Sequence, residues 1–526
     1  MSSSLMMVAF AGTELPADVA AEIAARPPAG VTLFRQHNVR SAAQVRALTA
    51  ALQAAAPAGH RPLLIAADQE GGQLVGLGED TTQFAGAMAL GAASDADLAE
   101  RVARAIGREL RALGVNVNYA PVCDLATNPA NPGLGIRSFG SDPTAVATLV
   151  AATVRGLQAV GVAATAKHFP GKGDAAVDTH HALAVVERDL AAFRERELVP
   201  FRAAIEAGAW LVMSGHFAAP ALTGDETLPA TLAPQVMRDL LRDELGHDGL
   251  VTTDALDMKA LAQGPAQMVE AIAAVRAGAD LLLGTVETEA RAGIEAGIAQ
   301  AALRRLVDPG ALDASADRLR RLRAWIAGFE APPLDVVGCP EHQTLARELA
   351  ERSQTLVRNE DGLLPIRLAA GARVALVMPR PADLTPADTS SSIRPALLEA
   401  VRRRHPRTDA FVVDHRPAPK DVVTLREEVR RYDLLILGTL SASLEPMQAE
   451  LVGALLASGV PSVTVALRTP WDLAAYPQAR THVCSYGILP PTVEALAAAL
   501  FGESRFAGRL PVLIGELHPL GWGLTG

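Results

Sequence analysis

Short apolar runs alternate with amphipathic segments through the first part of the chain. The runs have the length of buried strands, and the segments repeat their apolar positions at helical spacing. The runs that predict strands are 5–10, 31–34, 63–67, 115–119, 162–166, 210–213, 250–253 and 280–283. The segments that predict helices include 41–55, 95–113, 143–159, 189–207, 234–245 and 267–277. Eight regular strand–helix units imply parallel strands and favour an α/β fold with a closed (β/α)8 TIM barrel over a doubly wound open sheet.

A second α/β pattern follows a segment marked by proline and glycine. A helical segment at 309–326 ends the barrel pattern, and Pro332, Pro333 and Gly338 then indicate a linker. We therefore predict a barrel at 1–330, a linker at 331–345 and a smaller three-layer α/β/α sandwich domain at 346–526. Its predicted strands are 355–358, 374–378, 410–413, 434–437, 462–466 and 482–485. The second domain has three possible roles: it lends a loop to the mouth of the barrel, stabilises a dimer or covers apolar surface.

Composition narrows the class of protein. The 526 residues are 49% apolar and 20% charged, which fits a soluble globular chain of two or three domains. The net charge of −10 argues against nucleic acid and anionic membrane as partners. Three widely spaced cysteines, an N-terminus without a basic segment and the lack of a long apolar run lead us to expect a cytoplasmic protein. The oligomeric state stays open.

Polar and charged residues gather where the predicted strands end. In a (β/α)8 barrel this is the carboxyl-terminal face, where active sites lie. The residues at or just beyond these strand ends are Asp68, Asn118, Asp124, Arg137, Lys167, His168, Ser214, His216 and Asp254. Charged donors next to carboxylate acceptors suit a ligand with many hydroxyl groups. The histidines do not match a metal-ligand set, and we expect no metal and no cofactor.

The loop after the fifth predicted strand carries Asp178 two residues before His180. In an extended segment this spacing places both side chains on one side of the chain. The carboxylate then orients the ring, and the histidine can give and take protons near neutral pH. The alternative is that both side chains only satisfy backbone groups. Likewise, Lys167 and His168 can be a simple ion-pair donor and a packed ring.

Three further positions have both a functional and a structural interpretation. Asp254 ends a buried strand and is either a catalytic carboxylate or a helix N-cap; we expect Asp257 to be the N-cap instead. Arg137 either clamps an oxygen-rich group or pairs with Asp142. The sequence 68–72 (DQEGG) is either a ligand loop or an ordinary turn that the glycines permit.

These motifs together resemble the signature of family 3 glycoside hydrolases. The sequence 167–173 (KHFPGKG), followed by Asp178 and His180, resembles the NagZ-like β-N-acetylglucosaminidase branch in particular. Supporting matches are 11–15, 68–72, 136–140 and 253–258. The sequences 356–360, 363–365 and 508–512 resemble the second domain of the two-domain members.

The resemblance implies a retaining, double-displacement mechanism. Asp254 matches the nucleophile that forms a glycosyl-enzyme, and His180 matches the acid/base, oriented by Asp178. The positions that match contacts to sugar hydroxyls are Asp68, Arg137, Lys167, His168 and His216. The implied reaction is exo-hydrolysis of terminal β-linked N-acetylglucosamine from cell-wall muropeptide fragments. The rule of two carboxylates at a diagnostic separation does not apply, because the acid is a histidine. We expect its loop to move and to close on the substrate.

One departure concerns the glycan. Many NagZ-like sequences carry arginines after the Glu-Gly-Gly, whereas 73–78 contains no basic residue. An arginine contact to the sugar is therefore missing or supplied elsewhere. The alternatives are a glycoside phosphorylase, in which Lys172 or Arg137 holds phosphate beside a neutral histidine, another family 3 activity such as a β-glucosidase, and a non-catalytic sugar-binding protein.

Overall fold

The computed structural model describes residues 5–284, 288–394 and 396–525, and its first domain is a closed barrel of eight parallel strands. Strand order around the barrel follows chain order, and β12 pairs with β1. The strands are β1 (Met6–Val8), β2 (Gly30–Thr32), β3 (Leu64–Ala67), β6 (Val117–Asn118), β7 (Ala163–Phe169), β9 (Leu211–Ser214), β11 (Leu250–Ala255) and β12 (Leu281–Leu283). The predicted barrel is confirmed, and the open sheet is excluded.

Helices surround the barrel, as the amphipathic segments predict. They include α1 (Ala17–Ala25), α3 (Ala42–Ala55), α5 (Ala96–Ala112), α6 (Pro143–Gln158), α8 (Leu198–Glu206), η6 (Gln235–Glu244), α10 (Gln267–Ala277), α11 (Thr288–Leu303) and α12 (Pro309–Ala327). Ser41, Asp95 and Asp142 cap α3, α5 and α6 by accepting backbone N–H groups. No helix in the described part of the chain is long and apolar enough to cross a lipid bilayer.

Two small strand pairs beyond the barrel strands were not predicted. β4 (Gln69–Gly71) pairs with β5 (Leu74–Val75), and β8 (Ala184–Val185) pairs with β10 (Phe217–Ala218). β7 also extends three residues past its predicted end, so that Lys167 and His168 lie inside the strand. Strand geometry therefore fixes the backbone of these two residues at the barrel mouth.

The second domain contains a six-stranded sheet in the order β13-β18-β17-β16-β14-β15. Only β13 is antiparallel to its neighbour. The strands are β13 (Thr355–Asn359), β14 (Val374–Pro379), β15 (Thr408–Val413), β16 (Leu434–Thr439), β17 (Ser462–Ala466) and β18 (Thr481–Cys484). In β16, Leu435 and Leu437 pack in one apolar cluster with α15 (Pro419–Glu428) and α16 (Pro446–Leu456). Leu434 and Ile436 pack in another with α14 (Leu397–Arg404) and α18 (Pro490–Leu500). This is the predicted three-layer sandwich.

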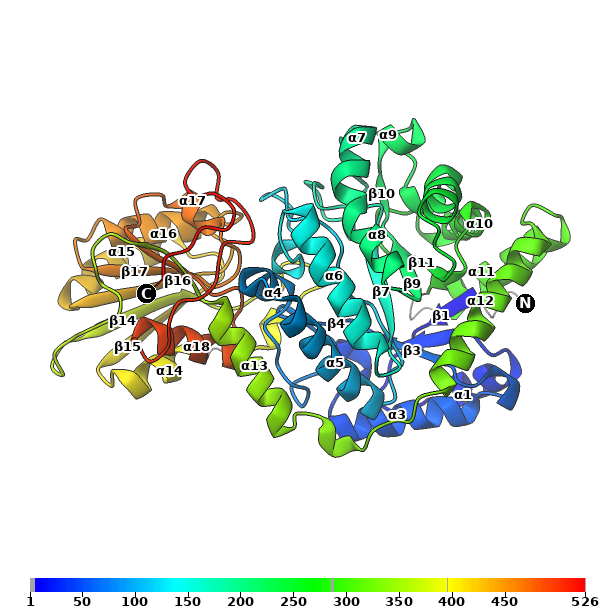
Figure 1. Ribbon diagram of the computed structural model, residues 1–526, viewed down its shortest axis with the longest axis horizontal. Helices are drawn as coiled ribbons and strands as arrows, with labels where there is room; N and C mark the ends of the chain where they lie inside the picture. Colours follow the sequence, from blue (N-terminus) through cyan, green and yellow to red (C-terminus); the bar gives the residue numbers. More distant parts are fainter. Residues whose placement is uncertain (1–4, 285–287, 395, 526) are drawn as a thin grey trace.

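The two domains lie side by side, and α13 (Pro340–Ser353) runs between them (Figure 1). This helix packs against α4 (Ala87–Ala93) and α5 of the barrel and against α18 of the second domain. It begins at Pro340, inside the segment predicted as a linker. The domain boundaries at 330 and 346 stay predictions.

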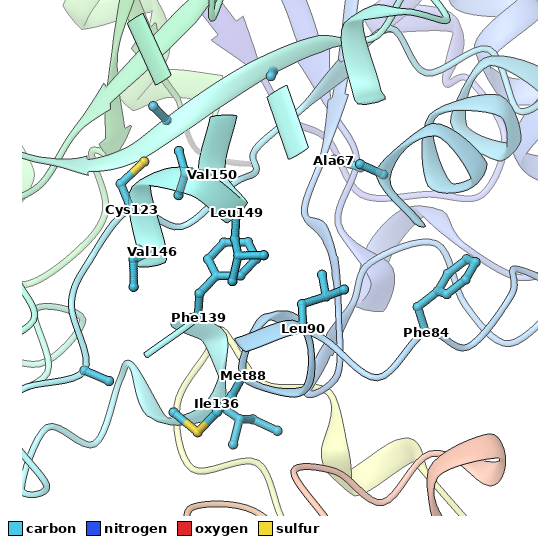
Figure 2. Packing of buried hydrophobic residues seen from close by; sticks show 14 of the residues in the cluster. Ala67, Phe84, Met88, Leu90, Cys123, Ile136, Phe139, Val146, Leu149 and Val150 are labelled. Atoms are coloured by element: carbon cyan, nitrogen blue, oxygen red, sulfur yellow. The ribbon is translucent and has the colours of Figure 1, made fainter. Parts of the chain in front are cut away.

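An apolar layer supports the barrel mouth behind the site. Ile136 and Phe139 lie close to Met88 and Leu90 of α4 and to Leu149 of α6 (Figure 2). Ile136 belongs to the short helix η3 (Gly135–Arg137), so this packing anchors the backbone that carries Arg137.

Candidate active site

A cavity of about 320 Å3 lies at the carboxyl ends of the barrel strands. This volume falls at the lower end of the range for small-molecule pockets, roughly 300–1,000 Å3. Six predicted site residues line it: Asp68, Arg137, Lys167, His168, His180 and Asp254. The other two, Asp178 and His216, lie behind the wall of the cavity and contact residues that line it.

A network of four charged side chains borders the cavity: Asp68, Arg137 and Lys167 line it, and Glu70 lies behind them. Lys167 Nζ lies 2.6 Å from Asp68 Oδ1 and 2.6 Å from Glu70 Oε1. The Glu70 carboxylate also accepts two hydrogen bonds from Arg137, at 2.8 and 2.9 Å. The acid partner of Arg137 is therefore Glu70 and not Asp142, which caps α6.

Electrostatics keep this network charged. Burial by itself raises the pKa of the Glu70 carboxyl, but the charges of Arg137 and Lys167 outweigh it and lower the pKa to about 2. Burial likewise lowers the pKa of Lys167, and Asp68 and Glu70 more than offset it, so that the pKa is raised. The site therefore presents fixed cations and carboxylates to a ligand that forms many hydrogen bonds.

His168 lies between the network and Asp254. Its Nδ1 lies 2.7 Å from Asp124 Oδ2, and its Nε2 lies 3.9 Å from Asp254 Oδ2. Burial lowers the pKa of His168 well below its usual value, so the ring is neutral. Nδ1–H then donates to Asp124, which leaves Nε2 as an acceptor on the cavity side. Asp124 also accepts the backbone N–H of Lys172 at 2.8 Å and so ties β7 to the following loop.

Asp254 lies near the carboxyl end of β11, and its side chain is 14% exposed. Burial raises the pKa of the carboxyl, but the charges of Lys172, His216 and His180 outweigh burial and hold the pKa below its usual value. Asp254 is not a helix cap, and the expectation that Asp257 is an N-cap is wrong. Turns follow β11, and α10 begins at Gln267 with Ala266 as its N-cap.

Asp178 and His180 are brought together, but by a turn at 179–181 and not by the extended segment from which their contact was predicted. Asp178 Oδ1 accepts the backbone N–H of His180 at 3.0 Å and lies 2.7 Å from its Nδ1. Burial raises the pKa of Asp178, and the hydrogen bond and charge of His180 outweigh it and lower the pKa to about 2. Because Nδ1 is bonded to Asp178, Nε2 is the ring nitrogen that can exchange a proton with a ligand in the cavity.

The His180 loop, residues 170–183, rests on the turns after β11. Lys259 N donates to His180 O at 3.4 Å, and Ala260 N donates to Thr179 O at 3.3 Å. These two long hydrogen bonds place the histidine near the strand that carries Asp254.

His216 does not reach the cavity. Its ring lies 2.9 Å from Thr231 Oγ1 through Nδ1 and 3.2 Å from the carbonyl of Ala255 through Nε2. Both ring nitrogens are bonded to the protein, so this side chain supports the end of β11 rather than a sugar hydroxyl.

Several residues of the site were missed. The segment that holds Glu70 was left open between a ligand loop and an ordinary turn; its side chain is only 6% exposed, lies behind the cavity wall and joins two cations. Arg35 and His37 follow β2, where the same strand-end rule points, and Tyr119 follows β6. The second domain supplies Pro386, Ala387, Asp388 and Thr389. The second domain therefore lends a loop to the mouth of the barrel, which is the first of the three roles considered for it.

Known proteins resemble this chain in both sequence and structure. The model of the glycosyl hydrolase family 3 N-terminal domain matches residues 3–322. The chain is 32% identical to β-hexosaminidase A of Pseudoalteromonas piscicida over 95% of this chain and 92% of that protein. It is 35% identical to a β-N-acetylglucosaminidase/β-glucosidase of Cellulomonas fimi over 90% of this chain and 86% of that protein. The structure of a family 3 β-N-acetylglucosaminidase from Paenibacillus sp. str. FPU-7 superposes with a TM-score of 0.90, at 34% identity over 98% of both chains.

Proposed function

Because the chain belongs to glycosyl hydrolase family 3 and is a glycoside hydrolase, we propose that it is a retaining exo-β-N-acetylglucosaminidase. It removes terminal β-linked N-acetylglucosamine, and cell-wall muropeptide fragments are the natural substrate class. The observation that carries the proposal is that an ionised Asp254 and the Asp178–His180 pair adjoin one cavity of small-molecule size. The names of the relatives from Pseudoalteromonas piscicida and Paenibacillus support the N-acetylhexosamine specificity.

In the first step the Asp254 carboxylate attacks the anomeric carbon of the bound sugar. The bond from that carbon to the leaving oxygen breaks, and His180 Nε2 gives its proton to the leaving oxygen. The negative charge of Asp178 stabilises the imidazolium that supplies this proton. Asp254 is suited to the attack because its lowered pKa keeps it unprotonated near neutral pH.

In the second step water attacks the anomeric carbon and gives a proton to His180. The bond between the sugar and Asp254 breaks, and the carboxylate is restored. Two inversions at the same carbon retain the β configuration of the product. Asp68, Arg137 and Lys167 hold the sugar hydroxyls throughout, because Glu70 fixes the two cations before the substrate arrives.

We also propose that the enzyme works in the cytoplasm. Cys123, Cys339 and Cys484 are all free thiols in the described structure, as a reducing compartment requires. Fractionation of the source cells, with detection of the native enzyme, tests this placement.

The direct test uses p-nitrophenyl N-acetyl-β-glucosaminide and the matching β-glucoside, each with and without phosphate. We expect selective release from the N-acetyl sugar, no dependence on phosphate and a product that NMR identifies as the β anomer. Asp254→Ala should abolish release. Unchanged turnover by this variant would overturn the assignment of the nucleophile.

Phosphorolysis is the second candidate. Once His180 has given its proton to the leaving oxygen, its neutral imidazole does not repel a phosphate dianion as a carboxylate does. Lys172 is buried, and its charge acts on Asp254 and Asp178, so a cation lies on the same side as the acid/base. Release that rises with phosphate, with formation of a sugar 1-phosphate, would select this reaction over hydrolysis.

A further inference from the structure

We infer that Arg35 and residues 386–389 of the second domain form an end wall of the sugar cavity. In this wall, Arg35 binds hydroxyl groups of the terminal sugar that lie away from the scissile bond. The inference rests on the proposed function, because it deepens the specificity of that site. It also answers how a cavity without a cation in the segment 73–78 holds the far end of its sugar.

Arg35 has the properties of a ligand-binding arginine. It follows β2, lines the cavity and has a side chain that is 18% exposed. Its Nη1 donates to the carbonyl of Val75 at 3.1 Å, which fixes its position. Its carboxylate partner, Glu79, lies 3.6 Å away and is 69% exposed, so this ion pair is weak. Arg137, in contrast, is held by the buried Glu70 at 2.8 Å.

No side chain can reach the cavity from position 76, beside Arg35. A Cβ on Gly76 would lie 2.4 Å from the carbonyl oxygen of Asp68, which accepts the Gly76 N–H at 3.0 Å. This close approach admits only glycine. The backbone beside the sugar-binding carboxylate of Asp68 is therefore bare, and Arg35 reaches this region from the neighbouring strand.

The same segment anchors the second domain. Gln73 O accepts the backbone N–H of Thr389 at 2.8 Å and its hydroxyl at 3.0 Å, and Gln73 Oε1 accepts Arg468 Nη2 at 2.6 Å. Arg468 also pairs with the buried Asp388 at 2.9 Å. Val75 N donates to Thr389 Oγ1 at 3.2 Å. These contacts fix residues 386–389 against the barrel, so the wall is rigid.

Strand order places this wall away from the scissile bond. Around the barrel, β2 is opposite β9, and β3 is opposite β11. Arg35 and Asp68 follow β2 and β3, whereas the His180 loop rests on the turns after β11. His180 protonates the leaving oxygen, so the aglycone lies on its side and the non-reducing end faces the wall. A wall there blocks longer chains and makes the enzyme exo-acting.

The test compares Arg35→Ala and Arg35→Gln with the native enzyme on the N-acetyl-β-glucosaminide and its 4-deoxy and 6-deoxy analogues. A hydrogen bond to a charged group is worth about 10- to 100-fold. We expect both variants to lose about that factor in kcat/KM on the full substrate and much less on one deoxy analogue. Arg40→Ala is the matched control, because Arg40 is exposed five residues further along and does not line the cavity.

Calorimetric binding of N-acetylglucosamine and its deoxy analogues gives a readout that needs no turnover. If the native enzyme and the variants discriminate equally among the analogues, the proposed role of Arg35 in the wall is wrong. An inactive native enzyme would overturn only the proposed function.

A second experiment replaces 386–389 by Gly-Ser-Gly-Ser and follows cleavage of p-nitrophenyl chitotrioside. We expect direct release of disaccharide from this variant and release of only monosaccharide by the native enzyme. A variant that still releases only monosaccharide would contradict the blocking role.

Discussion

The two sides of the cavity hold their charged groups in different ways. Glu70 and Lys167 lie on strands and Arg137 on a short helix, their side chains are 2–6% exposed, and their contacts are 2.6–2.9 Å long. His180, on the other side, is 21% exposed and sits in a loop attached to the turns after β11 by backbone hydrogen bonds of 3.3 and 3.4 Å.

Under the proposed function, this difference separates the residues that bind the sugar from those that transfer the proton. The network resists rearrangement, because moving one member leaves a buried charge without a partner. In the His180 loop, Val177 is exposed and Asp178 Oδ2 has no hydrogen-bond partner in the described structure. Asn128 and Asn131, in contrast, donate to the carbonyls of residues 172–175, so we expect motion only in the part of the loop near His180. Under the proposed function, we expect such a site to bind the sugar in a fixed frame and to bring the acid to it.

Breaking the network should have the largest effect on stability. Glu70→Gln leaves Arg137 and Lys167 buried with one carboxylate fewer, and we expect a loss of about 3–5 kcal/mol in the free energy of unfolding. Urea denaturation followed by near-UV circular dichroism measures it. Glu79→Gln is the control, since its exposed pair with Arg35 contributes about 0–1 kcal/mol. A loss no larger than that of the control would mean that the network is not cooperative.

Breaking the Asp178–His180 pair should affect activity much more than stability. Asp178→Asn removes the charge that stabilises the imidazolium, and we expect kcat/KM to fall about 100-fold or more. The free energy of unfolding should fall by less than the loss expected for Glu70→Gln, because Asp178 has one ionic partner where Glu70 has two. Steady-state kinetics and urea denaturation of one preparation measure both. A large loss of stability would place the pair with the rigid side of the cavity.

The sequence predicts the frame of the site better than its contacts. Each barrel strand is marked by its own apolar run, and the strand-end rule finds Asp68, Lys167 and Asp254 because each follows such a run directly. Glu70 was missed, because its role depends on the ion pair with Arg137, which lies 67 residues later in the chain. The two glycines that follow it left a ligand loop and an ordinary turn both open. Local spacing cannot supply such a pairing.

The contribution of the second domain to the cavity wall could not be predicted from the sequence for the same reason. Thr389 contacts Val75, which lies 314 residues earlier in the chain, and no motif near either residue indicates this contact. The capping prediction for Asp257 was wrong because it assumed that a helix follows β11 at once. The chain instead makes turns, and two of their N–H groups support the His180 loop.

The network should also give stability a pH dependence. The folded pKa of Glu70 is about 2, below its usual 4.5. Its contribution is therefore complete above pH 4.5 and is lost as the pH falls toward 2. We expect the stability difference between native enzyme and Glu70→Gln to be constant from pH 5 to 7 and to shrink below pH 4.5. Urea midpoints across this range measure it; a constant difference at all pH values would show that Glu70 is not ionised in the fold.

The smallest expected effect is a difference in local opening between the His180 loop and β7. It compares the two sides of the cavity most directly. Several N–H groups of the His180 loop bond within single turns, as Ala175 does to Lys172 O and His181 does to Asp178 O. Such groups exchange by local opening, whereas those of β7 exchange only when the barrel opens. We expect hydrogen–deuterium exchange to be faster in the loop than in β7, with Lys172, bonded to Asp124, as a slow exception inside the loop. Saturating N-acetylglucosamine should slow exchange in the loop and leave β7 unchanged. Equal protection of both segments would mean that the acid is held as firmly as the sugar-binding charges, and loop closure would then have no part in the reaction.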